Sequence, residues 1–224
     1  MTPSVDVFWS FRSPYSYLAT PQLVRLREDF DLQIVVRPVL PIAVRIDGFF
    51  KRVNPLWPPY LARDIYRLGQ MQGVPIRWPR PDPIVMDIAS GEVPADQPYI
   101  HRLTRLGQAA AEAGRGLEYV AEVGAVIWSG AVDDWHLGDH LARAAERAGL
   151  DPGALERAAA SEADRLDAQI AANQQALESA GHWGVPTMVF DGEPFFGQDR
   201  LDVLRWRLEQ RGVSKRRSEA IQAH

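Results

Sequence analysis

Near its N-terminus the chain reads Val5-Asp6-Val7-Phe8-Trp9-Ser10-Phe11-Arg12-Ser13-Pro14-Tyr15-Ser16-Tyr17-Leu18. The first half of this stretch is β-branched and aromatic, which is typical of a buried strand, and the pattern breaks at Ser13-Pro14. Serine at the N-cap followed by proline at the first helical position is a common beginning of a helix. The Ser13 hydroxyl is therefore expected at a helix N-terminus, where free N–H groups and the helix dipole favour negative charge. On these residues alone, Ser13 is either a simple cap or part of an anion site.

The two ends of the chain are predicted to form a β-α-β unit and a β-β-α unit. At the N-terminal end we expect a strand, a helix and a second strand over 4–10, 14–29 and 32–38. At the C-terminal end we expect a hairpin about the turn signal Asp191-Gly192 and then a helix, over 186–191, 193–196 and 199–211. Together these two units have the thioredoxin arrangement, which is an α/β fold.

The middle of the chain is predicted to be mostly helical. Loops without a sustained period are expected over 40–59 and 76–98. Helices are expected over 60–72, 99–113, 116–129, 137–148, 152–159 and 162–180. We therefore predict a discontinuous thioredoxin-like domain over 1–40 and 181–212, a large all-helical insertion over 41–180, and a flexible tail over 213–224.

Composition excludes several kinds of function. The chain has no cysteine, so it has no disulfide, thiolate metal site or redox motif of its own, and any thiol must come from a ligand. A formal net charge of -4 gives no reason to expect nucleic acid or a membrane as partner. Neither a signal peptide nor a membrane-spanning run is evident, so we expect a cytoplasmic protein. His136 and His140 lack a third ligand, and no metal site is expected.

Three motifs in order along the chain resemble one family. They are Phe11-Arg12-Ser13-Pro14-Tyr15-Ser16-Tyr17-Leu18-Ala19, Gly181-His182-Trp183-Gly184-Val185-Pro186-Thr187 and Phe195-Phe196-Gly197-Gln198-Asp199-Arg200-Leu201. With them the chain resembles the 2-hydroxychromene-2-carboxylate isomerases, relatives of kappa-class glutathione transferases in the DsbA-like group. Gln198 resembles the isomerases more than the transferases, in which serine is usual.

The resemblance implies glutathione as cofactor and a set of residues that hold it. The thiolate would lie against Ser13, the catalytic residue, and the backbone of Val185 before cis-Pro186 would bind the cysteinyl part. Asp199 would receive the γ-glutamyl ammonium, and the N-terminus of the last helix would receive the α-carboxylate. Asn54 resembles a family asparagine that contacts glutathione or substrate, and its alternative is an Asx-turn before Pro55. The implied cofactor-binding set is Ser13, Asn54, Val185, Pro186, Gln198, Asp199 and Arg200.

The implied reaction is a cis–trans isomerisation of an aromatic ring-cleavage product. A thiolate adds to an enone-like carbon, the former double bond rotates, and elimination returns the thiol. A homodimer is also implied. Two alternatives stay open: a kappa-like glutathione transferase that conjugates electrophiles, and a DsbA-like protein that binds without turnover. The chain departs from the family at 55–59, which is short and lacks a lysine; Arg52 and Arg63 are candidates to replace that cation.

Overall fold

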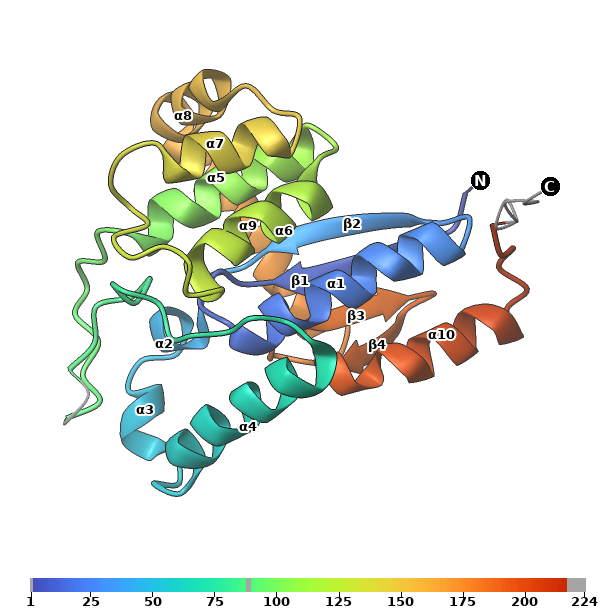
Figure 1. Ribbon diagram of the computed structural model, residues 1–224, viewed down its shortest axis with the longest axis horizontal. Coiled ribbons are helices and arrows are strands. Elements are labelled where there is room, and N and C mark those ends of the chain that lie inside the picture. The colour runs from blue at the N-terminus through green and yellow to red at the C-terminus, as the bar shows by residue number, and fades with distance from the viewer. Residues whose placement is uncertain (1, 88–89, 217–224) are drawn as a thin grey trace.

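A four-stranded mixed sheet forms the centre of the molecule in the computed structural model, which describes residues 2–87 and 90–216 (Figure 1). The strands are β1 (Ser4–Trp9), β2 (Gln33–Pro38), β3 (Thr187–Phe190) and β4 (Glu193–Phe196). Their order is β2-β1-β3-β4, with β1 parallel to β2 and antiparallel to β3, and β3 antiparallel to β4. The predicted α/β thioredoxin-like arrangement is confirmed.

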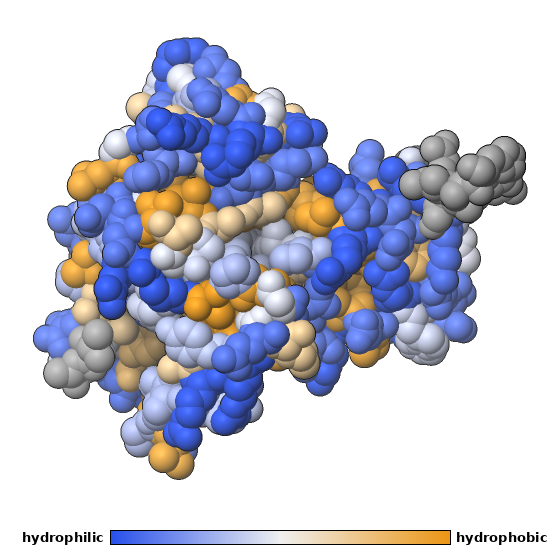
Figure 2. Space-filling model, in the orientation of Figure 1, coloured by the Kyte–Doolittle hydropathy of each residue, from blue (hydrophilic) through white to orange (hydrophobic). Residues whose placement is uncertain are grey.

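Helices surround this sheet and extend away from it. They are α1 (Pro14–Asp29), α2 (Ile42–Arg45), α3 (Phe49–Arg52), α4 (Trp57–Gln72), α5 (Ile100–Glu112), α6 (Gly116–Trp128), α7 (His140–Arg147), α8 (Pro152–Ser161), α9 (Ala163–Ser179), the 3-10 turn η1 (Gln198–Arg200) and α10 (Leu201–Gln210). The loop predicted over 40–59 contains α2 and α3, each a single turn and therefore too short to produce a hydrophobic period. Hydrophilic residues cover most of the face seen in Figure 2.

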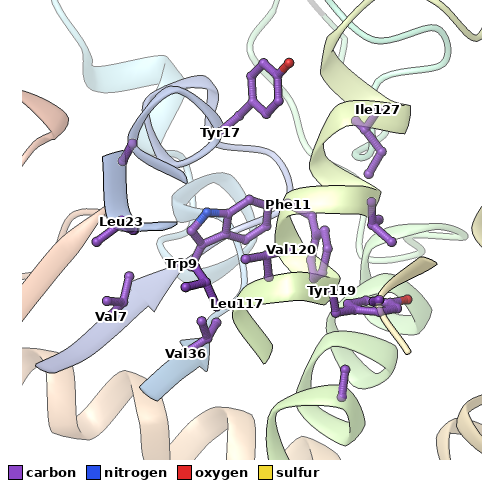
Figure 3. Packing of buried hydrophobic residues seen from close by; sticks show 14 of the residues in the cluster. Val7, Trp9, Phe11, Tyr17, Leu23, Val36, Leu117, Tyr119, Val120 and Ile127 are labelled. Carbon is purple, nitrogen blue, oxygen red and sulfur yellow. The ribbon is translucent and has the colours of Figure 1, made fainter. Parts of the chain in front are cut away.

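Alternate residues of β1 enter two different buried clusters. Val7 and Trp9 pack in the larger cluster with Leu23 of α1 (Figure 3). Phe8 packs in the smaller cluster with Leu177 of α9. Because side chains of a strand point alternately to its two faces, the apolar run of β1 fits a strand that is covered on both sides.

Phe11, the residue before the Arg12-Ser13 turn, is held by contacts with helices α5 and α6. Phe11 is fully buried, and Trp128 Nε1 donates a hydrogen bond to its carbonyl at 2.9 Å. A Cβ on Gly107 of α5 would lie 2.6 Å from the Phe11 ring, so only glycine allows this approach. Helices α5 and α6 thus share one core with the sheet. The division of the chain into domains stays a prediction.

The first residues of the predicted C-terminal tail contact the end of α1. The Asp31 N–H donates to the Ser214 carbonyl at 2.8 Å, and the Arg216 N–H donates to the Asp29 carbonyl at 2.8 Å. These bonds hold 213–216 against the end of α1, because that end of the helix and the start of β2 offer unpaired main-chain groups. The rest of the predicted tail, 217–224, lies outside the described residues. Within the described part of the chain, no helix is long and apolar enough to cross a membrane.

Candidate active site

A cavity of about 590 Å³ lies where the sheet meets the segment of α2 to α4. One side, which we call the sheet wall, consists of the β1–α1 turn, the start of α1, the loop before β3 and the end of β4. The other side, the helical wall, consists of α2, α3 and the start of α4. The lining residues of the sheet wall are Ser10, Arg12, Ser13, Pro14, Tyr15, Trp183, Gly184, Val185 and Phe196; those of the helical wall are Pro41, Ile42, Arg45, Phe49, Phe50, Val53, Asn54, Trp57 and Leu61.

Ser13 is the N-cap of α1 and also lines the cavity. Its Oγ accepts a hydrogen bond from the Ser16 N–H at 3.1 Å and donates a long one, at 3.4 Å, to the Val185 carbonyl. Capping uses a lone pair of the oxygen, so the hydroxyl can cap the helix and still donate its proton, here to the Val185 carbonyl. The two alternatives for Ser13 are therefore compatible in one geometry.

The loop before β3 brings Val185 opposite Ser13. The peptide bond between Val185 and Pro186 is cis, and Pro186 is buried. The Gly184 N–H donates to His182 Nδ1 at 2.9 Å, and the imidazole ring stacks on Phe196 with centroids 3.9 Å apart. Burial lowers the pKa of His182 below its ordinary value of 6.5. A neutral His182 therefore fixes the backbone of the loop that carries Val185.

The other predicted site residues divide into two groups. Asn54 lines the cavity, and its Oδ1 also accepts from the Leu56 N–H at 3.0 Å in an Asx-turn. The side chain of Gln198 is buried outside the cavity, where its Oε1 accepts from Gln72 Nε2 at 2.8 Å. Asp199 and Arg200 are exposed and form an ion pair with each other, at 2.8 Å. The roles of all these residues stay predictions.

Arg12 is a feature of the sheet wall that the sequence did not reveal. Its Nε and Nη2 donate to the two carboxylate oxygens of Asp82 at 3.1 and 3.0 Å. Asp82 also accepts from Trp78 Nε1 and from the Ile84 N–H, so it ties the predicted loop 76–98 to the β1–α1 turn. Seventy residues separate the partners, and no local pattern links them.

Further polar groups of the cavity also lacked a sequence signal. Ser10 is 1% exposed, and its Oγ has no hydrogen-bond partner among the described residues. The Tyr15 hydroxyl donates to Asp64 at 2.8 Å, and burial together with Asp64 raises the pKa of Tyr15 well above its ordinary value. Tyr15 is therefore a neutral donor, whereas the buried Ser10 hydroxyl has no hydrogen-bond partner among the described residues.

Arg45 and the aromatic residues determine the character of the helical wall. Arg45 Nη2 donates to the Trp183 carbonyl across the cavity, at 2.8 Å. Phe49 meets Phe50 edge-on with centroids 5.2 Å apart, and Phe50 stacks on Trp57 at 6.2 Å. Arg52 and Arg63, the candidates for the missing cation, lie outside the lining and donate to backbone carbonyls. No cluster of metal-ligating residues occurs in 2–87 or 90–216.

Comparisons with known proteins agree with this fold. The chain matches the family model of the DSBA-like thioredoxin domain over residues 4–209. A 2-hydroxychromene-2-carboxylate isomerase of Pseudomonas putida is 31% identical over 209 residues, covering 89% of this chain and 91% of that protein. A solved 2-hydroxychromene-2-carboxylate isomerase has a TM-score of 0.67 at 26% identity and covers 93% of this chain and 96% of its own. The cytosolic disulfide reductase DsbM of Pseudomonas aeruginosa, solved with GSH, is similar in fold alone, with a TM-score of 0.57 at 17% identity and coverage of 92% and 99%.

Proposed function

Because the chain belongs to the 2-hydroxychromene-2-carboxylate isomerase family of DsbA-like thioredoxin domains, we propose that it is a glutathione-dependent cis–trans isomerase acting on an aromatic ring-cleavage product. The observation that carries the proposal is the position of Ser13. Its hydroxyl lies at the N-terminus of α1 and faces Val185 inside a cavity. In a chain without cysteine, this place suits a thiolate that a ligand supplies.

The cavity has the size of a small-molecule binding site. A volume of about 590 Å³ is in the range of ordinary ligand pockets. A distant relative in fold, DsbM, has been solved with GSH, which supports glutathione as the ligand.

The chemistry divides between the ligand and the residues of the sheet wall. Bound glutathione supplies a nucleophilic thiolate that adds reversibly to an unsaturated carbon and so permits rotation about the former double bond. Ser13 donates its hydroxyl proton to the sulfur, and the free N–H groups at the start of α1 favour negative charge there. Both interactions lower the pKa of the thiol, so more of it is ionised at neutral pH.

Other residues orient the ligand and exclude water. The main chain of Val185 binds the cysteinyl part beside Pro186, and the side-chain amide of Asn54 binds from the helical wall. Asp199 and Arg200 receive the γ-glutamyl end just outside the cavity, next to Gln198, whose contact with Gln72 fixes η1. The aromatic residues of the helical wall shield the reacting carbon from solvent.

Product analysis tests this proposal directly. We expect purified protein to isomerise 2-hydroxychromene-2-carboxylate or a related ring-cleavage acid only when glutathione is added, without consuming it. Depletion of glutathione with formation of a conjugate would identify a kappa-like transferase instead. Calorimetry that detects no glutathione binding would leave the DsbA-like binding protein as the explanation.

We also propose that the protein is a homodimer, as family resemblance implies. Large hydrophobic side chains of α4 are exposed, among them Tyr60, Tyr66 and Met71, and a second subunit would cover such residues. Light scattering at micromolar concentration should give twice the mass of one chain. The mass of a single chain would contradict this part of the proposal. A cytoplasmic location stays a prediction.

A further inference from the structure

Arg45 is a charged side chain of the cavity with no acidic partner in contact. It ends α2 and lines the helical wall, and within the described part of the chain its side chain makes one hydrogen bond, to the Trp183 carbonyl. Among the described residues, no carboxylate oxygen lies within 4.0 Å of its guanidinium. Its Nε is also buried without a partner there.

Neighbouring basic side chains are already satisfied in other ways. Arg12, the second arginine of the lining, is neutralised by its two bonds to Asp82. Lys51 on α3 lies 3.8 Å from Glu92, and Arg52 donates to the Asp47 carbonyl. Arg45 is thus the cation of the lining whose charge is not compensated by a contact within the described residues.

The surroundings of Arg45 favour an anionic ligand. Burial lowers the pKa of Arg45, and the charge of Glu178, beyond contact distance, only partly offsets this effect. An arginine stays protonated nevertheless, so the cavity contains a partly desolvated positive charge. Most other lining residues are apolar or aromatic, so an anion there would be attracted with little screening.

We propose that Arg45 binds a carboxylate group of a ligand held in this cavity. The inference rests on the proposed function for the identity of the ligand, and two carboxylates are available: that of the aromatic substrate and the glycyl carboxylate of glutathione. Because Arg45 joins the helical wall to Trp183 of the sheet wall, a carboxylate bound to it would lie between the two walls. This arrangement supplies the cation that the segment 55–59 lacks.

Two pairs of probes test this assignment by binding rather than by turnover. The first pair is trans-cinnamate and its neutral analogue cinnamamide, followed by quenching of tryptophan fluorescence because Trp57 and Trp183 line the cavity. The second pair is glutathione and its glycine monoethyl ester, measured by calorimetry. The variants are Arg45→Gln and Arg45→Lys, and Arg52→Gln is the matched control, which removes the same charge outside the lining.

Selective loss of carboxylate binding is the expected result. Arg45→Gln should weaken either cinnamate or glutathione at least about tenfold while leaving the neutral member of that pair within about twofold, because a charge-assisted hydrogen bond is lost. Loss for cinnamate assigns Arg45 to the substrate, and loss for glutathione assigns it to the glycyl end. Arg45→Lys should lie between Arg45→Gln and the unaltered protein, and Arg52→Gln should match the unaltered protein.

Three outcomes overturn the assignment. The first is an equal loss for both members of a pair, which would mean that Arg45 only holds the Trp183 loop. The second is that Arg45→Gln changes none of the four dissociation constants. The third is that the unaltered protein binds neither cinnamate nor glutathione more tightly than the neutral amide or the ester paired with it. If the unaltered protein fails to bind glutathione at all, the proposed function is wrong, but the cinnamate pair still decides the role of Arg45.

Discussion

The two walls of the cavity are built in different ways. Hydrogen bonds and buried residues fix the sheet wall: Ser13 caps α1, Trp128 binds the Phe11 carbonyl, and His182 holds the Gly184 N–H. The helical wall contains two single-turn helices and aromatic side chains that mainly contact one another. A rigid wall can hold a thiolate within a few tenths of an ångström, whereas an aromatic wall adapts to different substrates. We infer that the sheet wall determines the chemistry and the helical wall determines the substrate.

The largest contrast should appear when an aromatic ring is removed from each wall. Phe11→Ala, in a fully buried position of the sheet wall, should lower the free energy of unfolding by about 3–5 kcal/mol. Trp57→Ala, on the helical wall and 38% exposed, should lower it by only about 1 kcal/mol. Urea denaturation of both variants measures these values. Similar losses would show that the two walls do not differ in rigidity.

A second contrast concerns one ion pair from each wall. Arg12→Met leaves Asp82 without its charged partner in a mostly buried position, and stability should fall by about 2–3 kcal/mol. Lys51→Met breaks an exposed pair at 3.8 Å on the helical wall and should cost about 0.5 kcal/mol or less. Thermal and urea unfolding at low salt compare the two. A loss for Lys51→Met as large as that for Arg12→Met would contradict the contrast.

The smallest effect is a pH dependence that His182 confers on the sheet wall. Its pKa in the folded protein lies below the ordinary 6.5, so on acidification the unfolded chain takes up a proton first. The contribution of His182 to stability is thus constant above about pH 6.5 and declines as the pH falls from there through the folded pKa. His182→Gln keeps an acceptor for the Gly184 N–H but does not titrate. The difference in free energy of unfolding between the two proteins should be independent of pH above about 6.5 and should change as the pH falls below that value. A difference that stays constant over the whole pH range would exclude His182 as the cause.

Local patterns in the sequence were sufficient to predict the sheet wall. The apolar run of β1, the Ser13-Pro14 beginning of α1 and the Asp191-Gly192 hairpin are each decided by neighbouring residues, and the structure has all three. The roles of Ser13 and Val185 came from the resemblance and stay predictions. In the structure the β1–β3 pairing brings the loop before β3 to the end of β1, so Ser13 Oγ lies 3.4 Å from the Val185 carbonyl oxygen.

Contacts between distant segments account for what the sequence did not reveal. The pair of Arg12 and Asp82 spans seventy residues, and Arg45 reaches a carbonyl 138 residues away. Gln198, whose role as a ligand contact stays a prediction, accepts a hydrogen bond from Gln72 and follows Gly197, whose φ of 101° redirects the chain. The direction of the Gln198 side chain depends on the positive φ of Gly197 and on a contact with α4. The spacing of residues along the sequence predicts neither of these.

The central claim is that the Ser13 hydroxyl stabilises a thiolate, and the titration of bound glutathione tests it most directly. The ultraviolet absorbance of the thiolate should be followed against pH in the unaltered protein, in Ser13→Ala and in Ser16→Ala, a control on the same helix whose Oγ has no partner among the described residues. We predict that Ser13→Ala raises the pKa of the bound thiol by about one to two pH units and slows turnover about ten- to hundredfold, whereas Ser16→Ala leaves the titration unchanged. Superimposable titrations of Ser13→Ala and the unaltered protein, with only a lower melting temperature, would contradict the claim and leave Ser13 as a helix cap.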